Sequence, residues 1–298
     1  MNRRAIPVYG LGVYRTDRPA PEGLFVGTLA DSIARRYFHP HPHTHPFFQV
    51  FLVTGKGGFT QDFSDYALAG PTLVFSSPGQ VHAVRLRPAL RGTFISFTQE
   101  FFDGGMPPPS RLPDFPFFFS DLPPLLPLKG PEAAAFRREF ADLRAEFDAG
   151  LPGAAEVIRA RLGIIFVRAA RLHARKHGGK LPSRPARLAR AFRLAVEHRF
   201  HEETSLAAYA AALGVTPNHL NDTLRRETGQ AAGALIRQRR LLEAKRLLLH
   251  SDLGIAEIGY RIGFGDPSYF GRFFRRAAGA APAAFREGIR EKYQGSRA

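Results

Sequence analysis

One segment of this 298-residue chain occurs twice, and this repetition limits the possible fold more than any other feature. Residues 205–229 read SLAAYAAALGVTPNHLNDTLRRETG, and residues 254–279 read GIAEIGYRIGFGDPSYFGRFFRRAAG. The two copies align at an offset of 49 residues until one extra residue, Gly265, shifts the offset to 50. A repeat of this kind indicates one small structural unit that is used twice.

Each copy predicts two short helices joined by a tight turn. The apolar residues of the first helix recur one turn apart, and Gly214 or Gly263 ends that helix. Thr216-Pro217 and Asp266-Pro267 then supply a side-chain oxygen for an N-cap and a proline for the first turn of a second helix. This order is typical of a helix-turn-helix unit, whose second helix enters the major groove of DNA.

The second helix of each copy turns polar and basic side chains outward. Leu220 and Leu224 lie one turn apart, as do Phe270 and Phe274, and we expect both pairs to face the core. Asn and Arg side chains make bidentate contacts with adenine and guanine, and Arg also binds phosphate. The residues that we expect to contact DNA are Asn218, His219, Asn221, Asp222, Arg225, Ser268, Tyr269, Arg272, Arg275 and Arg276.

A connecting helix is predicted between the two units, because apolar residues recur at helical spacing over residues 231–249. Such a helix would let the units address successive major-groove faces, about 34 Å apart. The alternative is an ordinary helical domain with charged, solvated faces. Duplication of the whole motif argues against that alternative.

Residues 187–293 resemble the DNA-binding domain of the AraC/XylS family of transcriptional regulators. The resemblance rests on the stretches RRLLEAKRLLLHSD and IAEIGYRIGFGDPSYFGRFFRRAAG and on Pro282 to Arg286. It implies a regulator, more often an activator than a repressor, with double-stranded DNA and RNA polymerase as partners. It also implies an effector-sensing N-terminal domain that forms a homodimer.

The chain departs from the family pattern at four positions. Asp222 stands where a basic or amide side chain is usual, and Gly271 leaves one potential DNA contact empty. Gly254 and Ala281 replace residues that usually carry a hydroxyl group. The DNA sequence that a relative recognises therefore cannot be transferred to this chain.

The N-terminal part is expected to be β-rich. Residues 47–97 contain short apolar runs broken by Gly, Pro and Asp, a pattern typical of an antiparallel sandwich or barrel. A breaker-rich stretch around residues 178–185 marks a domain boundary. The expected fold class is α+β with two domains: a cupin-like antiparallel barrel with a helical hairpin over residues 1–180, and an all-helical double helix-turn-helix domain over residues 187–293.

A helical hairpin follows the predicted strands, because apolar residues recur every three or four positions on both sides of the turn at residues 150–153. Its apolar seam could pack on the barrel of its own chain or also hold a second copy. For a homodimer contact we expect Ile158, Leu162, Ile165 and Leu172.

Histidines cluster near the predicted strands. His39, His41, His43 and His45 alternate with other residues, so an extended chain would place all four on one face. HTHPFFQ and PGQVH resemble the two metal motifs of the cupin barrel, with Gln49 where Glu is common. The alternatives are an organic effector site, a bound zinc or iron ion, and purely structural histidines. We expect an effector site formed by Arg15, His43, His45, Gln49, Phe75 and His82, without a metal or a cofactor.

Composition narrows the class of protein. The chain lacks cysteine, which excludes disulfides, thiolate metal sites and thiol nucleophiles. Its formal net charge is +16, and residues 181–298 carry 20 basic and 11 acidic side chains, which fits a polyanion partner. We expect a cytoplasmic, nucleoid-associated protein without a membrane segment, a signal peptide or a catalytic residue. The alternatives are a metal-dependent cupin enzyme fused to a DNA-binding domain and a non-specific nucleoid protein.

Overall fold

The structure is a computed structural model that describes residues 7–14, 20–35, 41–85, 90–104, 111–118, 123–176 and 183–295. The described chain divides into two compact units, one from Val8 to Ser183 and one that begins at Arg184. Arg15 and His39 lie outside the described residues.

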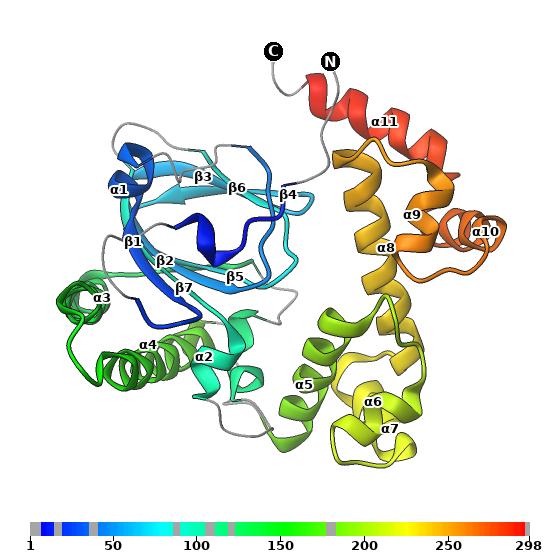
Figure 1. The fold of residues 1–298 in the computed structure, drawn as a ribbon. Helices are drawn as coiled ribbons and strands as arrows, with labels where there is room; N and C mark the ends of the chain where they lie inside the picture. The colour runs from blue at the N-terminus through cyan, green and yellow to red at the C-terminus, as the bar shows by residue number, and fades with distance from the viewer. Residues whose placement is uncertain are drawn as a thin grey trace. The chain divides into compact units, whose positions relative to one another are not determined.

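The N-terminal unit contains two antiparallel sheets (Figure 1). The five-stranded sheet has the order β1 (Leu24–Thr28), β7 (Arg91–Phe97), β2 (Phe48–Thr54), β5 (Thr72–Ser76) and β8 (Leu125–Pro127). The three-stranded sheet has the order β4 (Ser64–Ala69), β3 (Lys56–Gln61) and β6 (His82–Arg85). Both sheets contribute to one apolar core, which includes Phe51 and Phe94 from the first and Phe59 from the second.

The closed barrel that the sequence suggested is not supported. The described strands form two separate sheets around a shared core, so the fold of this unit is a two-sheet sandwich. The α+β class and the antiparallel pairing agree with the prediction. The sequence pattern could not distinguish sandwich from barrel, because both use short strands with one buried face.

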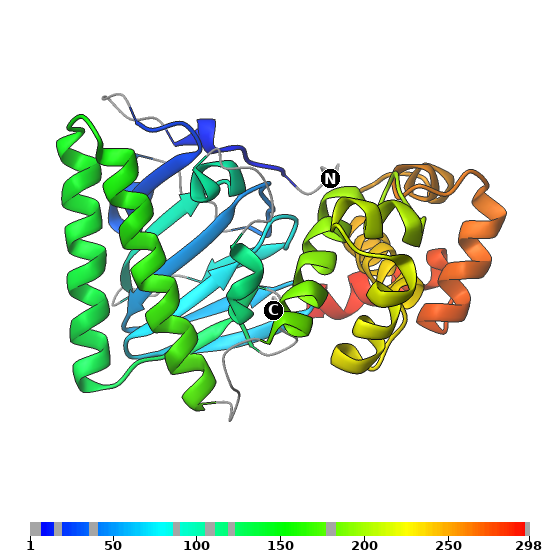
Figure 2. The ribbon, with the colours of Figure 1, turned by 90° about the horizontal axis from the view of Figure 1, so that it is seen from below.

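Helices cover the outer face of the five-stranded sheet. α3 (Gly130–Ala149) and α4 (Ala154–Lys176) form the expected hairpin and lie side by side across the sheet (Figure 2). The chain reverses at Gly150, whose φ of 59° favours glycine. Shorter helices are α1 (Leu29–Ala34), α2 (Gln99–Asp103) and the 3-10 segments η1 (Leu11–Val13), η2 (Leu112–Asp114) and η3 (Pro116–Phe118).

The C-terminal unit is helical throughout its described elements. Its helices are α5 (Arg184–Arg199), α6 (Leu206–Ala212), α7 (Pro217–Thr228), α8 (Ala232–His250), α9 (Ile255–Arg261), α10 (Pro267–Ala278) and α11 (Pro282–Gly295). Two apolar cores form, one among α5, α6 and α7 and one among α9, α10 and α11. α8 supplies Leu235 and Ile236 to the first core and Leu247 and Leu248 to the second, so one continuous helix joins both halves.

Candidate nucleic-acid interface

The sequence starts α7 and α10 in the same way. Thr216 Oγ1 accepts a hydrogen bond from the backbone N–H of His219 at 3.2 Å, and Asp266 Oδ1 accepts one from Tyr269 at 2.6 Å. Both helices have proline in the first turn and end at a glycine with positive φ. The two helices therefore begin and end at equivalent positions of the repeat.

The inward faces of α7 and α10 also match. Leu220 and Leu224 are fully buried in the first half, and Phe270 and Phe274 are fully buried in the second. These residues were expected to face the core, and the structure places them there. Each pair fixes the rotation of its helix, so the opposite face of each helix is turned to solvent.

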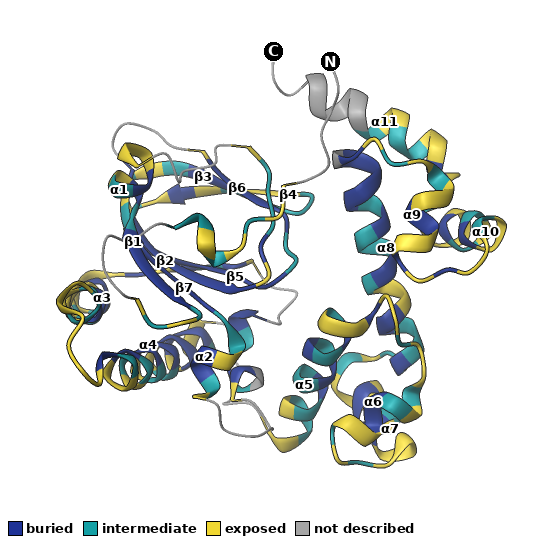
Figure 3. Cartoon of the chain, viewed as in Figure 1, coloured by how far each residue is buried: buried dark blue, intermediate teal, exposed yellow. Residues whose placement is uncertain are grey.

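The outward faces carry the residues expected to contact DNA. All of those residues except Asn221 are exposed, namely Asn218, His219, Asp222, Arg225, Ser268, Tyr269, Arg272, Arg275 and Arg276. Figure 3 shows exposed segments on both α7 and α10. At the offset of 50 residues, each exposed residue of α7 from Asn218 to Arg226 has an exposed counterpart in α10. The two helices thus present the same face of the repeat.

Asn221 has a different place from the one expected. It is half-buried, and its Oδ1 accepts a hydrogen bond from the backbone N–H of Ala232 at 3.2 Å. Ala232 begins α8, so this contact satisfies one of the free N–H groups at the start of that helix. The matching residue in α10 is Gly271, which cannot make such a contact. Helical spacing alone could not reveal this partner in the next helix.

Tyr269 and Arg272 form the most prominent exposed group on α10. The Tyr269 side chain is 59% exposed although it is large and aromatic. Its ring lies 5.7 Å from the ring of Phe264, and the guanidinium of Arg272 lies 6.0 Å from the Tyr269 ring centre. A planar cation beside an exposed ring suits contact with base edges and phosphates.

The connecting helix α8 sets the separation of the two halves. It has 19 residues, which is about 28 Å at 1.5 Å per residue. Arg240 in the middle of α8 donates from Nε to the carbonyl oxygen of Phe200 at 2.6 Å and from Nη1 to that of Gly263 at 3.5 Å. Because these acceptors belong to different halves, Arg240 ties the two halves to the same point of α8.

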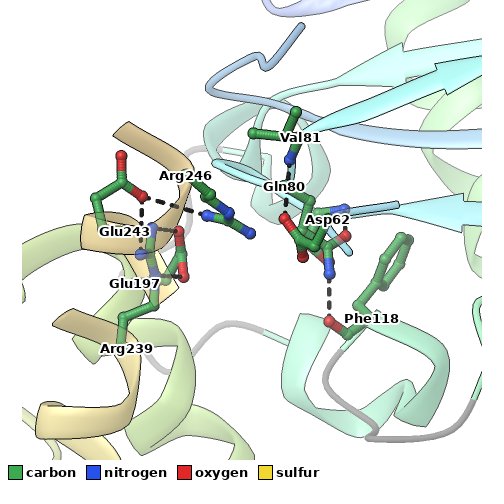
Figure 4. A network of polar contacts seen from close by, with 9 residues as sticks. Asp62, Gln80, Val81, Phe118, Glu197, Arg239, Glu243 and Arg246 are labelled. Carbon is green, nitrogen blue, oxygen red and sulfur yellow. Dashed lines mark hydrogen bonds and ion pairs between the residues drawn. The ribbon is translucent and has the colours of Figure 1, made fainter. Parts of the chain in front are cut away.

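A partly buried ion-pair network attaches α5 to α8 (Figure 4). Arg239 donates to both carboxylate oxygens of Glu197, at 2.5 and 2.6 Å, and to Glu243 at 2.9 Å. Burial disfavours the charged guanidinium, but the two carboxylates outweigh it and hold the pKa of Arg239 above its ordinary value. Its guanidinium also stacks on the Phe200 ring at 4.1 Å. These contacts stiffen the body that carries α7 and α10.

Three histidines of the N-terminal unit, His43, His45 and His82, lie close together. The ring of His82 is 4.5 Å from that of His43 and 4.7 Å from that of His45. Burial is the main reason why the pKa of His45 falls to about 3 and why that of His82 falls well below its ordinary value. Among the described residues, no group of three or more His, Asp or Glu side chains is arranged to hold a metal ion.

Gln49 organises the polar atoms around His45. His45 Nδ1 lies 2.7 Å from the carbonyl oxygen of Phe47, and Nε2 lies 2.9 Å from the Gln49 amide. The atom of Gln49 that faces Nε2 is Oε1, so the single N–H of a neutral imidazole donates either to Phe47 or to Gln49. Gln49 Nε2 donates to the Tyr14 hydroxyl at 3.0 Å and to the Ser96 hydroxyl at 2.9 Å. His45, Gln49, Tyr14 and Ser96 thus form one hydrogen-bonded network.

Two further sets of expected site residues belong to the core of their own chain. Phe75 is buried, and its ring stacks on that of Phe117 at 3.9 Å. The residues expected at a dimer seam, Ile158, Leu162, Ile165 and Leu172, are all buried within the protomer. Helical spacing identified the apolar face of α4, but that face is buried within the same chain.

The C-terminal fold and its two exposed helices define the class of this unit as a double helix-turn-helix domain. The family described as "Helix-turn-helix domain" matches residues 209–288. The HTH-type transcriptional activator RhaS of Salmonella schwarzengrund is 36% identical over 93 residues, which are 31% of this chain and 34% of RhaS. The C-terminal unit is an AraC-type helix-turn-helix domain. The match spans about a third of the length of the curated relatives.

Solved structures give weaker likenesses. The DNA-binding domain of AdpA, solved in complex with a target DNA, is 33% identical and covers 35% of this chain and 94% of that chain, with a TM-score of 0.33. ToxT from Vibrio cholerae, solved with an unsaturated fatty acid, is 13% identical and covers 90% of this chain and 96% of that chain, with a TM-score of 0.37.

Proposed function

We propose that this protein is a sequence-specific DNA-binding regulator of transcription, and that it acts as an activator rather than as a repressor. One observation carries the proposal: α7 and α10 expose the same face of the repeat from one stiff body. Double-stranded DNA repeats its major groove every helical turn, about 34 Å, so two matched helices suit two successive groove faces. The helix-turn-helix match to a transcriptional activator supports the same function.

The proposed DNA contacts divide into two kinds. Arg272 and Asn218 are the candidates for reading bases, because both are exposed, both can make bidentate contacts, and both precede the last turns of their helices. Arg225, Arg275 and Arg276 lie in the last turns and are the candidates for phosphate contacts. Asn221 is not one of these candidates, because its side chain accepts a hydrogen bond from Ala232.

The proposal assigns the N-terminal unit to effector sensing and dimer formation, with a cupin-like arrangement of its two sheets. An effector would act by binding more tightly to one of two states of the protein, and so change how the dimer and RNA polymerase occupy DNA. No helix among the described residues is long and apolar enough to span a membrane. A regulator of this kind acts at the nucleoid in the cytoplasm, without a catalytic role.

Arg272→Ala tests the DNA-reading assignment. Fluorescence anisotropy with a selected duplex should show that specific binding weakens by about 1 to 3 kcal/mol and that discrimination at one base pair is lost. Arg261→Ala is the control, since Arg261 is an exposed arginine of α9 outside the two reading helices. If Arg272→Ala weakens binding equally for selected and random duplexes, Arg272 contacts phosphate and does not read a base.

Two other functions would show different behaviour. A non-specific nucleoid protein would bind promoter and random duplexes alike at moderate salt. A cupin enzyme would need a stoichiometric metal and turnover that depends on His43, His45 and His82. The contacts that His45 and Gln49 already make with each other, with Phe47 and with Ser96 favour the regulator.

A further inference from the structure

A groove on the N-terminal unit lies away from the histidine cluster. It has a volume of about 520 Å³ and is formed by α1, α3 and the ends of β2 and β7. This volume falls in the range of sites for small organic molecules. The groove lies within one compact unit, so its walls do not depend on the position of the helix-turn-helix domain.

The walls of the groove are apolar. Leu52 of β2, Phe140 of α3 and Leu90, just before β7, are buried side chains that reach it. Ile33 of α1 stands at the groove and is 51% exposed, which is unusual for a large aliphatic side chain. An apolar body in the groove would therefore cover surface that the protein leaves in contact with water.

Two arginines give the groove a positive charge. Arg91 at the start of β7 and Arg137 of α3 both line it. Both are exposed, and among the described parts of the chain neither is paired with a carboxylate. The neighbouring acids of α3 are used elsewhere, since Glu139 and Asp142 pair with arginines of α4.

Threonines complete the polar contacts near the arginines. Thr54 of β2 and Thr93 of β7 line the groove and can donate from their hydroxyl groups. Apolar walls with two arginines and two hydroxyl groups suit a ligand with one acidic group on an apolar body. Guanidinium groups bind carboxylate and similar anions through paired N–H donors.

We propose that this groove binds a small organic acid with an apolar, naphthalene-sized body. The site couples to the rest of the unit through Arg144 of α3, which pairs with Asp31 of α1 at 2.9 Å. A ligand held between α1 and α3 would affect the ion pair between Arg144 and Asp31 and the hairpin that α3 forms with α4. The inference deepens the proposed sensor role and rests on it only for the regulatory consequence.

Fluorescence titration of the full chain tests the site with two dyes. The anionic probe 1-anilinonaphthalene-8-sulfonate should bind at one saturable site, and 2-naphthoate should displace it whereas neutral 2-naphthalenemethanol should displace it weakly. The double variant Arg91→Gln/Arg137→Gln should weaken the anionic probe by about tenfold or more. It should leave the affinity for the neutral probe N-phenyl-1-naphthylamine within about twofold of the parent protein's, because the apolar walls are intact.

Matched variants separate this site from general dye binding. Arg138→Gln removes the exposed arginine next to Arg137 that does not line the groove, and it should leave both probes unchanged. Ala141→Trp fills the groove from an exposed position of α3 and should abolish binding of both probes. Circular dichroism melting of each variant verifies folding.

Unchanged binding of the anionic probe by the double arginine variant, or by a folded Ala141→Trp protein, would overturn the proposal. Displacement by an acidic peptide but not by 2-naphthoate would also overturn it, because the partner would then be a protein. Gel shifts on the same preparations measure DNA binding separately from probe binding, so the regulator and the groove are tested independently. Loss of specific DNA binding with intact probe binding would count against the regulator and not against the groove.

Discussion

The carbonyl oxygen of His201 occupies the space beside Gly263 in which any other residue would carry its Cβ atom. His201 follows α5 in the first half of the helix-turn-helix domain, and Gly263 lies in the turn of the second half. Arg240 closes the same joint from α8. The turn glycine therefore ends α9 and also lets the two halves meet.

Gly263→Ala should destabilise the domain more than an ordinary turn substitution. Gly263 has a φ of 87°, and an added Cβ would also collide with the His201 backbone and approach Arg240 Nη2 at 2.8 Å. Backbone strain and the collision together should lower the free energy of unfolding by about 3 kcal/mol or more. Urea unfolding followed by far-UV circular dichroism measures the change.

Two other turn glycines provide the controls. Gly214→Ala occupies the equivalent turn of the first half with a φ of 66° and open space around it, so it should cost about 1 kcal/mol. Gly265→Ala has neither a positive φ nor a close neighbour and should stay within about 0.5 kcal/mol of the parent. Equal effects at Gly214 and Gly263 would show that the His201 contact does not constrain the joint.

The sequence predicted the helix-turn-helix domain well because its constraints are local. Caps such as Thr216 and Asp266, turn glycines and apolar residues one helical turn apart are all visible within a few positions of each other. Contacts between distant residues were not visible in this way. The bond from Asn221 to Ala232 and the fit of Gly263 against His201 depend on how separate elements meet.

The N-terminal unit was harder to predict for the same physical reason. Its strands pair across long stretches of chain, and β8 joins β5 from more than 45 positions away. Periodicity marked the apolar face of α4 but not whether its own sheet or a second copy would cover it. The groove between α1 and α3 exists only because distant elements adjoin, so no local motif announced Arg91 and Arg137.

Acid should weaken the N-terminal unit through its buried histidines. In the folded protein the pKa of His45 is about 3 and that of His82 is well below the ordinary 6.5, whereas both return to about 6.5 on unfolding. The unfolded chain therefore binds more protons below pH 6.5, and stability falls as the pH drops through that value. His45 should contribute about 1 kcal/mol per pH unit between pH 6 and 4, and His82 should add a loss of the same sign.

Hydrogen exchange of the β2 amides at pH 4 to 7, corrected for intrinsic rates, measures this dependence in the intact chain. His45→Gln should reduce the slope, and the remaining slope should come from His82, since one of the two buried imidazoles is gone. His201→Gln, which changes an exposed histidine of the other unit, should leave the slope as it is. A pH-independent stability in the parent protein would mean that the two imidazoles are accessible to protons in the folded state.

An exposed stripe on α4 is the surface that we propose for the dimer. Val157 is 40% exposed and Ile164 is 43% exposed, and they lie two helical turns apart on a face of α4 beside the buried seam. Val157→Lys/Ile164→Lys should convert a dimer to a monomer without unfolding it, because both side chains are on the surface. Sedimentation velocity at several concentrations, with melting by circular dichroism, measures both properties.

Ile158→Lys should instead unfold the N-terminal unit, since Ile158 is fully buried in its own chain and a lysine there would leave a charge without water. A dimer that survives the double substitution would place the contact on another surface.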